Sequence, residues 1–343
     1  MRKLLNTLFV VSEDAYLSLD GENIVVNREE GIAGRFPLHT LESILCFSYK
    51  GASPSLMGAC ARRNIALSFF TPRGRFLCRA MGQTTGNVLL RREQYRRADD
   101  EEKSLYLAQA FVTGKIYNAR WVLERAKRDH ALRVDVAKIS SASGWMAQAC
   151  RDAGMCANMQ ALRGVEGMAA MRYFAVLDEL ILQNKEHFFF RGRSRRPPMD
   201  RVNALLSFVY TLLAHDCAAA LEGVGLDAYV GFFHRDRPGR TSLALDLMEE
   251  LRPILGERFA LSLINGRILG PAQFDVYENG TVLLNEKGRK TVLGAWQERK
   301  RETLTHPFLK EKLCWGMVPY VQALLLSRYL RDELDGYPPF LWK

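Results

Sequence analysis

The hydrophobic periodicity of the chain changes once, near residue 87, and this change restricts the folds that the chain can adopt. Before it, short apolar runs such as "TLFVV" and "NIVVN" are separated by turn signals such as Asp20-Gly21, a pattern that favours β-strands. After it, apolar residues recur at helical spacing. We therefore predict an α+β fold with a small β-rich domain at residues 1–86 and a larger all-α domain at residues 87–343.

Three segments depart from this division. The stretch from Ser53 to Arg63 ("SPSLMGACARR") is typical of a helix and lies within the β-rich part. "RGRSRRPP", from Arg191 to Pro198, is a basic linker that a helix cannot cross because of its prolines. The segment from Phe274 to Arg289 contains Asn279-Gly280 between apolar residues, so we expect a small hairpin there.

The sequence indicates a cytoplasmic protein. The first apolar run ends near Ser12 without a small-residue cleavage site, so we expect a first strand there and no signal peptide. The most apolar segment, from Val202 to Leu221, contains His215 and Asp216, which favours a buried helix over a membrane span. The seven cysteines are scattered and never spaced as CxxC, so we expect neither a zinc site nor a disulfide framework.

The charge of the chain predicts a polyanionic partner. The formal net charge is +10 and the pI is near 9.3. Two clusters of arginines are candidate DNA contacts, namely Arg191, Arg193, Arg195 and Arg196 in the basic linker, and Arg235, Arg237 and Arg240 further along the chain. Guanidinium groups can bind phosphates through two parallel hydrogen bonds. Solvated surface charge is the alternative explanation of both clusters.

Glu166 occupies an unusual place on a helix that we predict from about Asn158 to Phe188. At 100° per residue, apolar residues such as Leu162 and Tyr173 form one face, and Glu166 lies near the middle of that face. Burial of an ionised carboxylate costs several kcal/mol unless the group is paired or binds a cation. Glu166 is therefore either half of a buried salt bridge with an arginine or a metal ligand inside a cleft.

A second group of candidate ligands lies further along the chain. In the helix predicted for "SLALDLMEELRPIL", Asp246 and Glu249 share one flank of the apolar stripe. Glu250 is also one turn from Asp246, so the helical wheel does not choose between the two glutamates. His234 precedes this helix, and a Pro-Gly turn lets its imidazole approach the same point. Such residues are usually structural, but three converging ligands of these types would suit Mg²⁺ or Mn²⁺ better than zinc.

Several of these motifs resemble one known family. They are "LRGVEGMAAMRYF", "RPPMDRVNALLSFVYTLLAHD" and "GFFHRDRPGRTSLALDLMEELRP", with "AYLSLDGENIVV" and "RFPLHTLESI" in the β-rich part and "HPFLKEKLCWGMVPYVQALLLSRYLR" near the end. Together they resemble the CRISPR-associated integrase and endonuclease family, CRISPR-associated protein one, over essentially the whole chain. The β-rich motifs are similar to those of its type I-C branch in particular.

The resemblance implies a β-sandwich-like N-terminal domain that forms a homodimer, and a helical C-terminal domain with one divalent metal site. The family's ligands are a Glu, a His and an acidic residue in a D-x-x-[DE] helix. On this sequence they match Glu166, His234 and Glu249, with Asp246 beside them. The resemblance thus selects Glu249 over Glu250. It implies that all four matched residues are catalytic and that the first three bind Mg²⁺ or Mn²⁺.

The resemblance also implies a function, which is CRISPR adaptation in antiviral defence. Two homodimers, bridged by a dimer of CRISPR-associated protein two, would hold a protospacer duplex whose 3′-hydroxyl ends attack the CRISPR repeat. The same site could cut branched DNA, because hydrolysis and strand transfer differ mainly in the nucleophile. The nuclease CRISPR-associated protein four is a further expected partner, and no membrane is involved.

Two other functions are compatible with the same residues. A structure-specific, metal-dependent DNA nuclease of repair would share the metal site but would need no integration partner. A non-catalytic, basic DNA-binding scaffold would use Glu166 only as the partner of an arginine.

Overall fold

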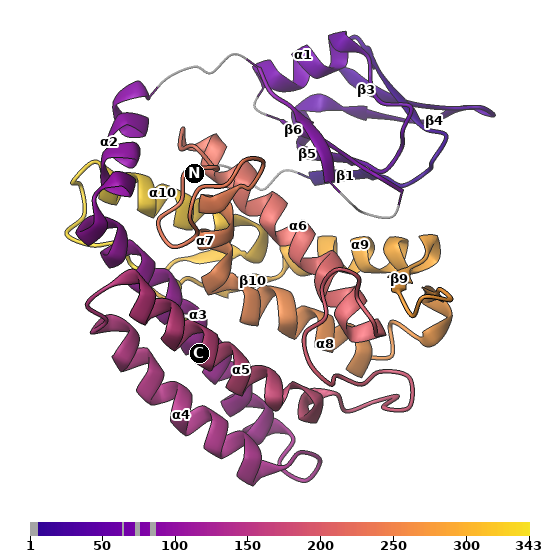
Figure 1. Cartoon of the computed structure of the whole chain (residues 1–343). Helices are drawn as coiled ribbons and strands as arrows, with labels where there is room; N and C mark the ends of the chain where they lie inside the picture. Colours follow the sequence, from indigo (N-terminus) through magenta and orange to yellow (C-terminus); the bar gives the residue numbers. More distant parts are fainter. Residues whose placement is uncertain (1–5, 64, 73–75, 83–86) are drawn as a thin grey trace.

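The computed structural model describes residues 6–63, 65–72, 76–82 and 87–343, and it shows a β-rich part followed by a mostly helical part (Figure 1). The predicted α+β class, with a sandwich-like domain ahead of a larger helical domain, is confirmed. The predicted boundary between residues 86 and 87 borders residues 83–86, which lie outside the described residues. That boundary therefore stays a prediction.

Two sheets share one core in the β-rich part. The mixed sheet has the order β1-β5-β6-β7 and the antiparallel sheet has the order β2-β3-β4. Their strands are β1 (Asn6–Val10), β2 (Tyr16–Asp20), β3 (Asn23–Arg28), β4 (Gly31–Pro37), β5 (Leu41–Cys46), β6 (Ala66–Phe70) and β7 (Phe76–Ala80). Leu17 of β2, Ile44 of β5 and Leu56 of α1 (Pro54–Arg62) lie in one buried cluster. Side chains of both sheets thus fill the space between them, as in a β-sandwich.

Local signals explain how these elements begin and turn. Gly21 connects β2 and β3 with a φ of 58°, a conformation that glycine adopts without steric cost. The predicted helix at Ser53 to Arg63 is α1, and the Ser53 side chain accepts a hydrogen bond from the backbone N–H of Leu56 at 3.3 Å. This is a standard N-cap, followed by a proline in the first turn.

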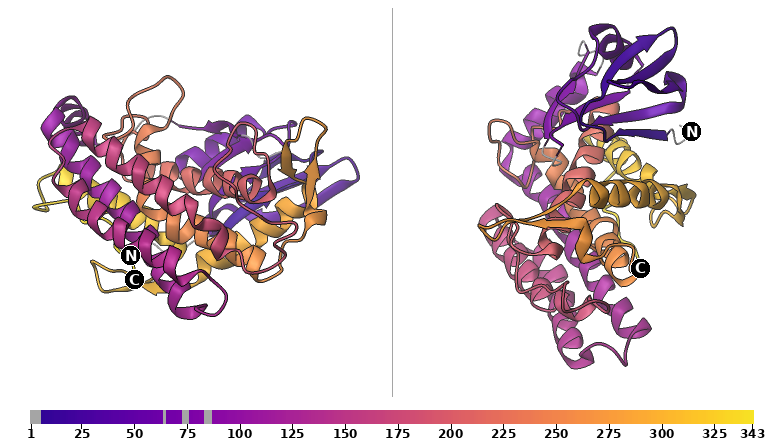
Figure 2. Two further views of the ribbon diagram at one scale, coloured as in Figure 1. Left: turned by 60° about the horizontal axis from the view of Figure 1, so that its bottom comes forward. Right: turned by 90° about the vertical axis from the view of Figure 1, so that its right-hand side faces the viewer.

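The helical part is built around α6 (Arg201–Gly223), while α3, α4 and α5 pack together at one end (Figure 2). The other α-helices are α2 (Val88–Asp99), α3 (Glu101–Asp129), α4 (Val136–Gly154), α5 (Met159–Ala175), α7 (Ser242–Leu251), α8 (Arg258–Asn265), α9 (Glu286–Arg301) and α10 (Val318–Leu330). A π-helical turn, η3 (Arg252–Glu257), joins α7 to α8. The side chains of Asp100 and Asn158 cap the N-termini of α3 and α5.

The apolar segment predicted as a buried helix is α6. Among the described residues it is the one helix that is long and apolar enough to cross a membrane, but 67% of its apolar window is buried inside the fold. Leu205, Val209 and Leu213 have no exposed surface. In this structure α6 is therefore a core helix.

The β-rich part rests on α6 through aromatic and charged contacts. Phe47 stacks on Phe70 with ring centroids 5.1 Å apart and also approaches Phe208 of α6 at 6.5 Å. Arg79 of β7 forms an ion pair with Glu222 near the end of α6. These contacts fix the two parts relative to each other (Figure 1).

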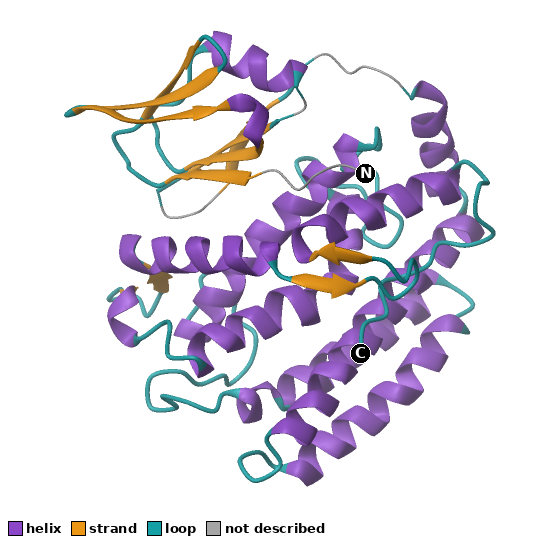
Figure 3. Cartoon of the chain, turned by 180° about the vertical axis from the view of Figure 1, so that it is seen from behind, coloured by secondary structure: helices purple, strands orange, loops and turns teal. Residues whose placement is uncertain are grey.

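Two sequence predictions about the helical part need correction. The helix predicted to reach Phe188 ends at Ala175, because the chain folds back: Asp178 accepts a hydrogen bond from the N–H of Phe190 at 2.7 Å, and Phe188 packs edge-on against Phe274. The part predicted as all-α also contains two short hairpins. The first, β8 (Phe274–Val276) and β9 (Val282–Leu284), confirms the predicted hairpin. The second, β10 (Thr303–Thr305) and β11 (Lys312–Cys314), was not expected and is visible from behind (Figure 3).

Candidate active site

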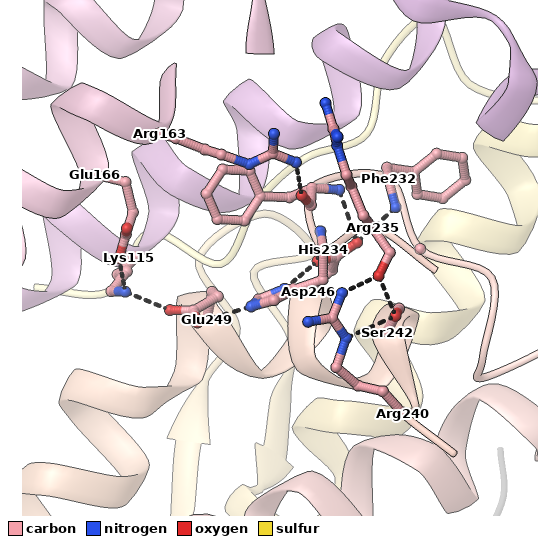
Figure 4. A network of polar contacts seen from close by, with 12 residues as sticks. Lys115, Arg163, Glu166, Phe232, His234, Arg235, Arg240, Ser242, Asp246 and Glu249 are labelled. Carbon is pink, nitrogen blue, oxygen red and sulfur yellow. Dashed lines mark hydrogen bonds and ion pairs between the residues drawn. The ribbon is translucent and has the colours of Figure 1, made fainter. Parts of the chain in front are cut away.

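One buried carboxylate, that of Asp246 on α7, holds the loop between α6 and α7. Its Oδ2 accepts hydrogen bonds from the backbone N–H groups of Phe232 (2.7 Å) and Phe233 (3.0 Å) (Figure 4). Its Oδ1 accepts a hydrogen bond from the N–H of His234 (2.9 Å). Asp246 is completely buried, so its loss would leave these donors without their partner. Asp246 thereby determines where the backbone of His234 lies.

Asp246 also orients the His234 ring. Nδ1 of His234 lies 2.6 Å from Oδ1 of Asp246. Because the carboxylate already accepts three N–H groups, it acts as an acceptor here too, so Nδ1 carries a proton, and in the neutral ring Nε2 is then the nitrogen with the free lone pair. Nε2 lies 4.0 Å from Oε1 of Glu249. A carboxylate that fixes the histidine tautomer in this way is typical of metal-binding histidines.

Side chains of three other helices donate hydrogen bonds to backbone carbonyl oxygens of the same loop. Gln94 of α2 donates to the carbonyl oxygen of Val230 at 2.9 Å, and Ser104 of α3 donates to that of Phe232 at 3.0 Å. Arg163 of α5 donates to the carbonyl oxygen of Phe233 at 2.9 Å. The loop is therefore a fixed part of the fold where it carries His234.

Gly231 is a position in this loop with no room for a side chain. A Cβ atom there would lie 2.8 Å from Cβ of Ser242 and 2.9 Å from both Oδ2 of Asp246 and the carbonyl oxygen of His234. We expect Gly231→Ala to lower the free energy of unfolding by about 1–3 kcal/mol, as overpacking does. Urea unfolding measures this loss. Gly164→Ala on α5, where a Cβ meets nothing within 4 Å, is the control and should not destabilise. Equal stability of the Gly231 variant and the wild type would contradict the steric argument.

Glu249 and Glu250 face different sides of α7. Glu250 accepts hydrogen bonds from the Tyr337 hydroxyl (2.5 Å) and the Phe340 N–H (2.7 Å) in the core. Burial raises the pKa of Glu250 to about 7. Glu249 turns instead toward His234. Tertiary packing thus separates two neighbours that the helical wheel could not distinguish.

The Glu249 carboxylate is buried and charged. Its Oε1 lies 2.8 Å from Nη1 of Arg252, and its Oε2 lies 2.7 Å from Nζ of Lys115. Burial by itself raises the pKa of Glu249, but Arg252 and Lys115 outweigh burial and hold it at about 2. Glu249 is therefore an anion at neutral pH.

Lys115 of α3 connects Glu249 to Glu166. Its ammonium forms ion pairs with Glu166 on α5 and with Glu249 on α7 (Figure 4). The Glu166 side chain is 21% exposed, so it lines the edge of the site and is not enclosed in the core. The salt bridge considered for Glu166 exists in this structure, but its partner is a lysine and not an arginine.

The donor groups suit a hard divalent cation. The Glu249 carboxylate links the three candidates, because its Oε2 shares the Lys115 ammonium with Glu166 and its Oε1 lies 4.0 Å from Nε2 of His234. Throughout the described ranges, no three His, Cys, Asp or Glu side chains stand close enough together to hold an ion as they are arranged. Lys115 lies between Glu166 and Glu249, so it would have to move before Glu166, His234 and Glu249 could share one. In charge and donor type the residues fit Mg²⁺ or Mn²⁺.

The candidate DNA-binding arginines divide into exposed and structural side chains. The exposed ones are Arg191, Arg195, Arg196, Arg235 and Arg237. Arg240 donates hydrogen bonds to the carbonyl oxygen of Arg235 and to Oγ of Ser242. Arg193 donates from Nη1 to Oδ1 of Asn203 at 2.6 Å. Arg193 and Arg240 therefore use their guanidinium groups to hold the chain.

Sequence reasoning missed Lys115, although a signal was present. Phe111, Val112 and Ala119 form a buried stripe on α3, and Lys115 lies on the same stripe. A charged residue on the apolar face of a helix is the feature that singled out Glu166. The long helix carries many charges, and this one was not separated from the solvated ones.

Comparison with known proteins identifies the family to which the chain belongs. The family model for "CRISPR associated protein Cas1" matches residues 8–298. The chain belongs to the Cas1 family. It is 48% identical to CRISPR-associated endonuclease Cas1 1 of Chlorobaculum tepidum and 50% identical to CRISPR-associated endonuclease Cas1 2 of Rhodospirillum rubrum, in both cases over all of each chain.

Other members of the Cas1 family are joined to further proteins. A Cas4/Cas1 fusion of Geobacter sulfurreducens is 33% identical over 97% of this chain, which covers 60% of the fusion.

Among solved structures, a casposase bound to an integration product matches with a TM-score of 0.84 at 21% identity, over 99% of this chain and 95% of the other. A Cas1 protein from Thermotoga maritima matches with a TM-score of 0.80 at 21% identity, over 95% and 97%. These two structures show a shared fold.

Proposed function

We propose that the protein is a divalent-metal-dependent DNA integrase and endonuclease that inserts protospacer DNA into a CRISPR array in the cytoplasm. One observation carries this proposal: Lys115 joins Glu166 of α5 to Oε2 of Glu249 on α7, and Nε2 of His234 lies 4.0 Å from Oε1 of the same Glu249. The relatives named CRISPR-associated endonuclease Cas1 support it. The type I-C branch, suggested by the sequence motifs, is part of the proposal.

Each residue of the site has a distinct role in this proposal. Glu166 and Glu249 supply negative charge for the cation, and His234 supplies a neutral nitrogen through Nε2. A bound divalent cation would polarise the scissile phosphate and lower the pKa of the attacking 3′-hydroxyl or water. Asp246, expected from the resemblance to be catalytic, is proposed here as a positioning residue, because both of its oxygens hold the loop and ring of His234.

The exposed arginines extend the proposal to DNA binding. Arg235 directly follows His234, Arg237 lies two residues further along the loop, and both are exposed, so they can meet phosphates next to the site. Arg191, Arg195 and Arg196 are exposed in the basic linker and would form a second contact. Because Arg193 and Arg240 are engaged within the fold, we expect them to support these loops and not to bind DNA directly.

The proposed assembly follows the family. Two homodimers would bind a dimer of CRISPR-associated protein two, with protospacer duplex and repeat as DNA substrates. A solved structure described as a Cas6-RT-Cas1–Cas2 complex matches this chain with a TM-score of 0.81 at 22% identity, over 100% of this chain and 36% of the other. CRISPR-associated protein four is proposed as a further partner on the basis of the Cas4/Cas1 fusion.

The test is a joining assay with and without metal. It uses a short duplex with free 3′-hydroxyl ends, a supercoiled repeat-bearing plasmid, the purified chain and CRISPR-associated protein two. We expect a chelator to abolish joining, and added Mg²⁺ or Mn²⁺ to restore it, because the chelator removes the cation that Glu166, His234 and Glu249 are proposed to bind. DNA binding, measured by fluorescence anisotropy in the same buffers, should persist in the chelator because it depends on the arginines.

The other outcomes identify the alternatives. Metal-dependent cutting of branched DNA without any joining would favour a repair nuclease. DNA binding with neither cutting nor joining would favour a scaffold. Joining that is unaffected by the chelator would refute the proposed metal-dependent mechanism.

A further inference from the structure

The Lys115 ammonium lies between two of the three proposed metal ligands. It contacts Oε1 of Glu166 and lies 2.7 Å from Oε2 of Glu249, so it is shared by carboxylates on two different helices. Only 13% of the Lys115 side chain is exposed. The lysine is thus a built-in counter-ion of the site and not a surface residue that happens to lie near it.

Close helix packing puts Lys115 there. The preceding residue, Gly114, lies so near α7 that an added Cβ would be 2.9 Å from Cβ of Glu250. With no side chain at that point, α3 and α7 approach each other closely. Lys115 can then reach Glu249, the residue next to Glu250, on the other side of the contact.

Both glutamates have cationic partners without any metal. Lys115 pairs with Glu166 and Glu249, and Arg252 pairs with Glu249. A divalent cation added beside an unmoved Lys115 would compete for the same carboxylate oxygens and would be repelled by the ammonium. Binding of the cation and retention of the Lys115 contacts are therefore mutually opposed.

We propose that Lys115 is a resident cation which the divalent metal displaces, so that Lys115 lowers the metal affinity of the site and keeps the metal-free protein stable. This inference rests on the metal site of the proposed function. Its rival is that Lys115 holds Glu166 and Glu249 in position for the metal. The two explanations predict opposite effects of removing the ammonium.

The test measures metal binding by the full-length chain, with no DNA present. Mn²⁺ is titrated into wild type, Lys115→Met and Lys115→Gln, and free Mn²⁺ is followed by electron paramagnetic resonance. The Glu249→Gln variant lacks the charge of a proposed ligand, so the Mn²⁺ that it still binds is bound elsewhere on the protein. We expect both Lys115 variants to bind Mn²⁺ roughly tenfold more tightly than wild type, because the competing charge is gone. We also expect their thermal midpoints to be lower than that of wild type without metal and to rise more when Mn²⁺ is added.

Two controls separate charge from general disturbance. Lys115→Arg retains the positive charge and should keep the metal affinity near that of wild type. Lys138→Met removes an exposed lysine that pairs with Glu179 and Asp135 on the outer side of the helical part, and it should change nothing. Unchanged or weaker Mn²⁺ binding by both Lys115→Met and Lys115→Gln would overturn the inference.

A measurement on the wild type covers the case in which the variants fail to fold. Reductive methylation followed by mass spectrometry reports how accessible the Lys115 amine is. We expect Mn²⁺ to increase the methylation rate of Lys115 severalfold and to leave that of Lys138 unchanged. If Mn²⁺ binds at the site without this increase, Lys115 is not displaced and the inference is wrong. If wild type binds no more Mn²⁺ than Glu249→Gln does, it is the proposed metal site that fails.

Discussion

Glu249→Gln is expected to reduce metal-dependent joining and cutting by roughly a thousandfold while the protein stays folded. Glutamine has nearly the same shape but no negative charge, so it binds a divalent cation poorly. It also leaves Lys115 paired with Glu166, which limits the disturbance of the metal-free site. The measurement is the joining rate at several Mn²⁺ concentrations, with circular dichroism and thermal unfolding to confirm the fold.

The matched control for this prediction is the next residue, Glu250→Gln. Glu250 is on the same helix and equally buried, but its oxygens bind Tyr337 and Phe340 in the core. We expect this variant to join DNA at a rate within a few-fold of wild type. Equal losses in both variants would mean that disturbance of α7, and not the loss of a ligand, explains the effect.

Asp246→Asn is expected to lower joining by about 100-fold and the free energy of unfolding by about 2–4 kcal/mol. The carboxylate accepts from three backbone N–H groups and lies within hydrogen-bond distance of His234 Nδ1. An asparagine amide has one acceptor oxygen and adds an N–H₂ group, so at least one buried donor loses its partner. The His234 ring also loses the anion that fixes its tautomer. Joining kinetics and urea unfolding measure the two effects.

Asp236→Asn provides the comparison within the same loop. Asp236 is exposed, and its single contact in this loop is a long one of 3.5 Å from the Gly231 N–H. It should therefore change neither joining nor stability. If Asp246→Asn behaved like Asp236→Asn, the loop would not depend on the buried carboxylate, and the positioning role proposed for Asp246 would have to be abandoned.

For α5, the sequence pattern predicted the direction of the Glu166 side chain but not the end of the helix. The apolar stripe indicated that Glu166 turns toward other protein, and its carboxylate does contact Lys115 of α3, because the 3.6-residue period fixes the direction of each side chain; the side chain is nevertheless 21% exposed and not buried as expected. The same stripe wrongly extended the helix to Phe188. The helix ends at Ala175 because Phe188 packs against Phe274, a residue far away in the sequence.

The site shows the same division. His234, Asp246 and Glu249 could be selected as candidates from their residue types, their spacing and the family resemblance. Neither Lys115 nor Arg252 was selected, although both contact Glu249. Their importance depends on how α3 and η3 pack against α7, and a periodicity calculation for one helix contains no information about its neighbours.

The sequence by itself determined the class of fold, because a two-residue period and a 3.6-residue period cannot form the same element. It also determined which faces of the helices are buried, and through its motifs it indicated the family. Only the tertiary structure decided which charged groups meet. Glu166, Lys115 and Glu249 lie on three helices, and their contacts depend on close approaches such as that of α3 to α7 at Gly114. Helix periodicity gives the direction of a side chain, whereas the distance between two side chains is set by the packing of the helices that carry them.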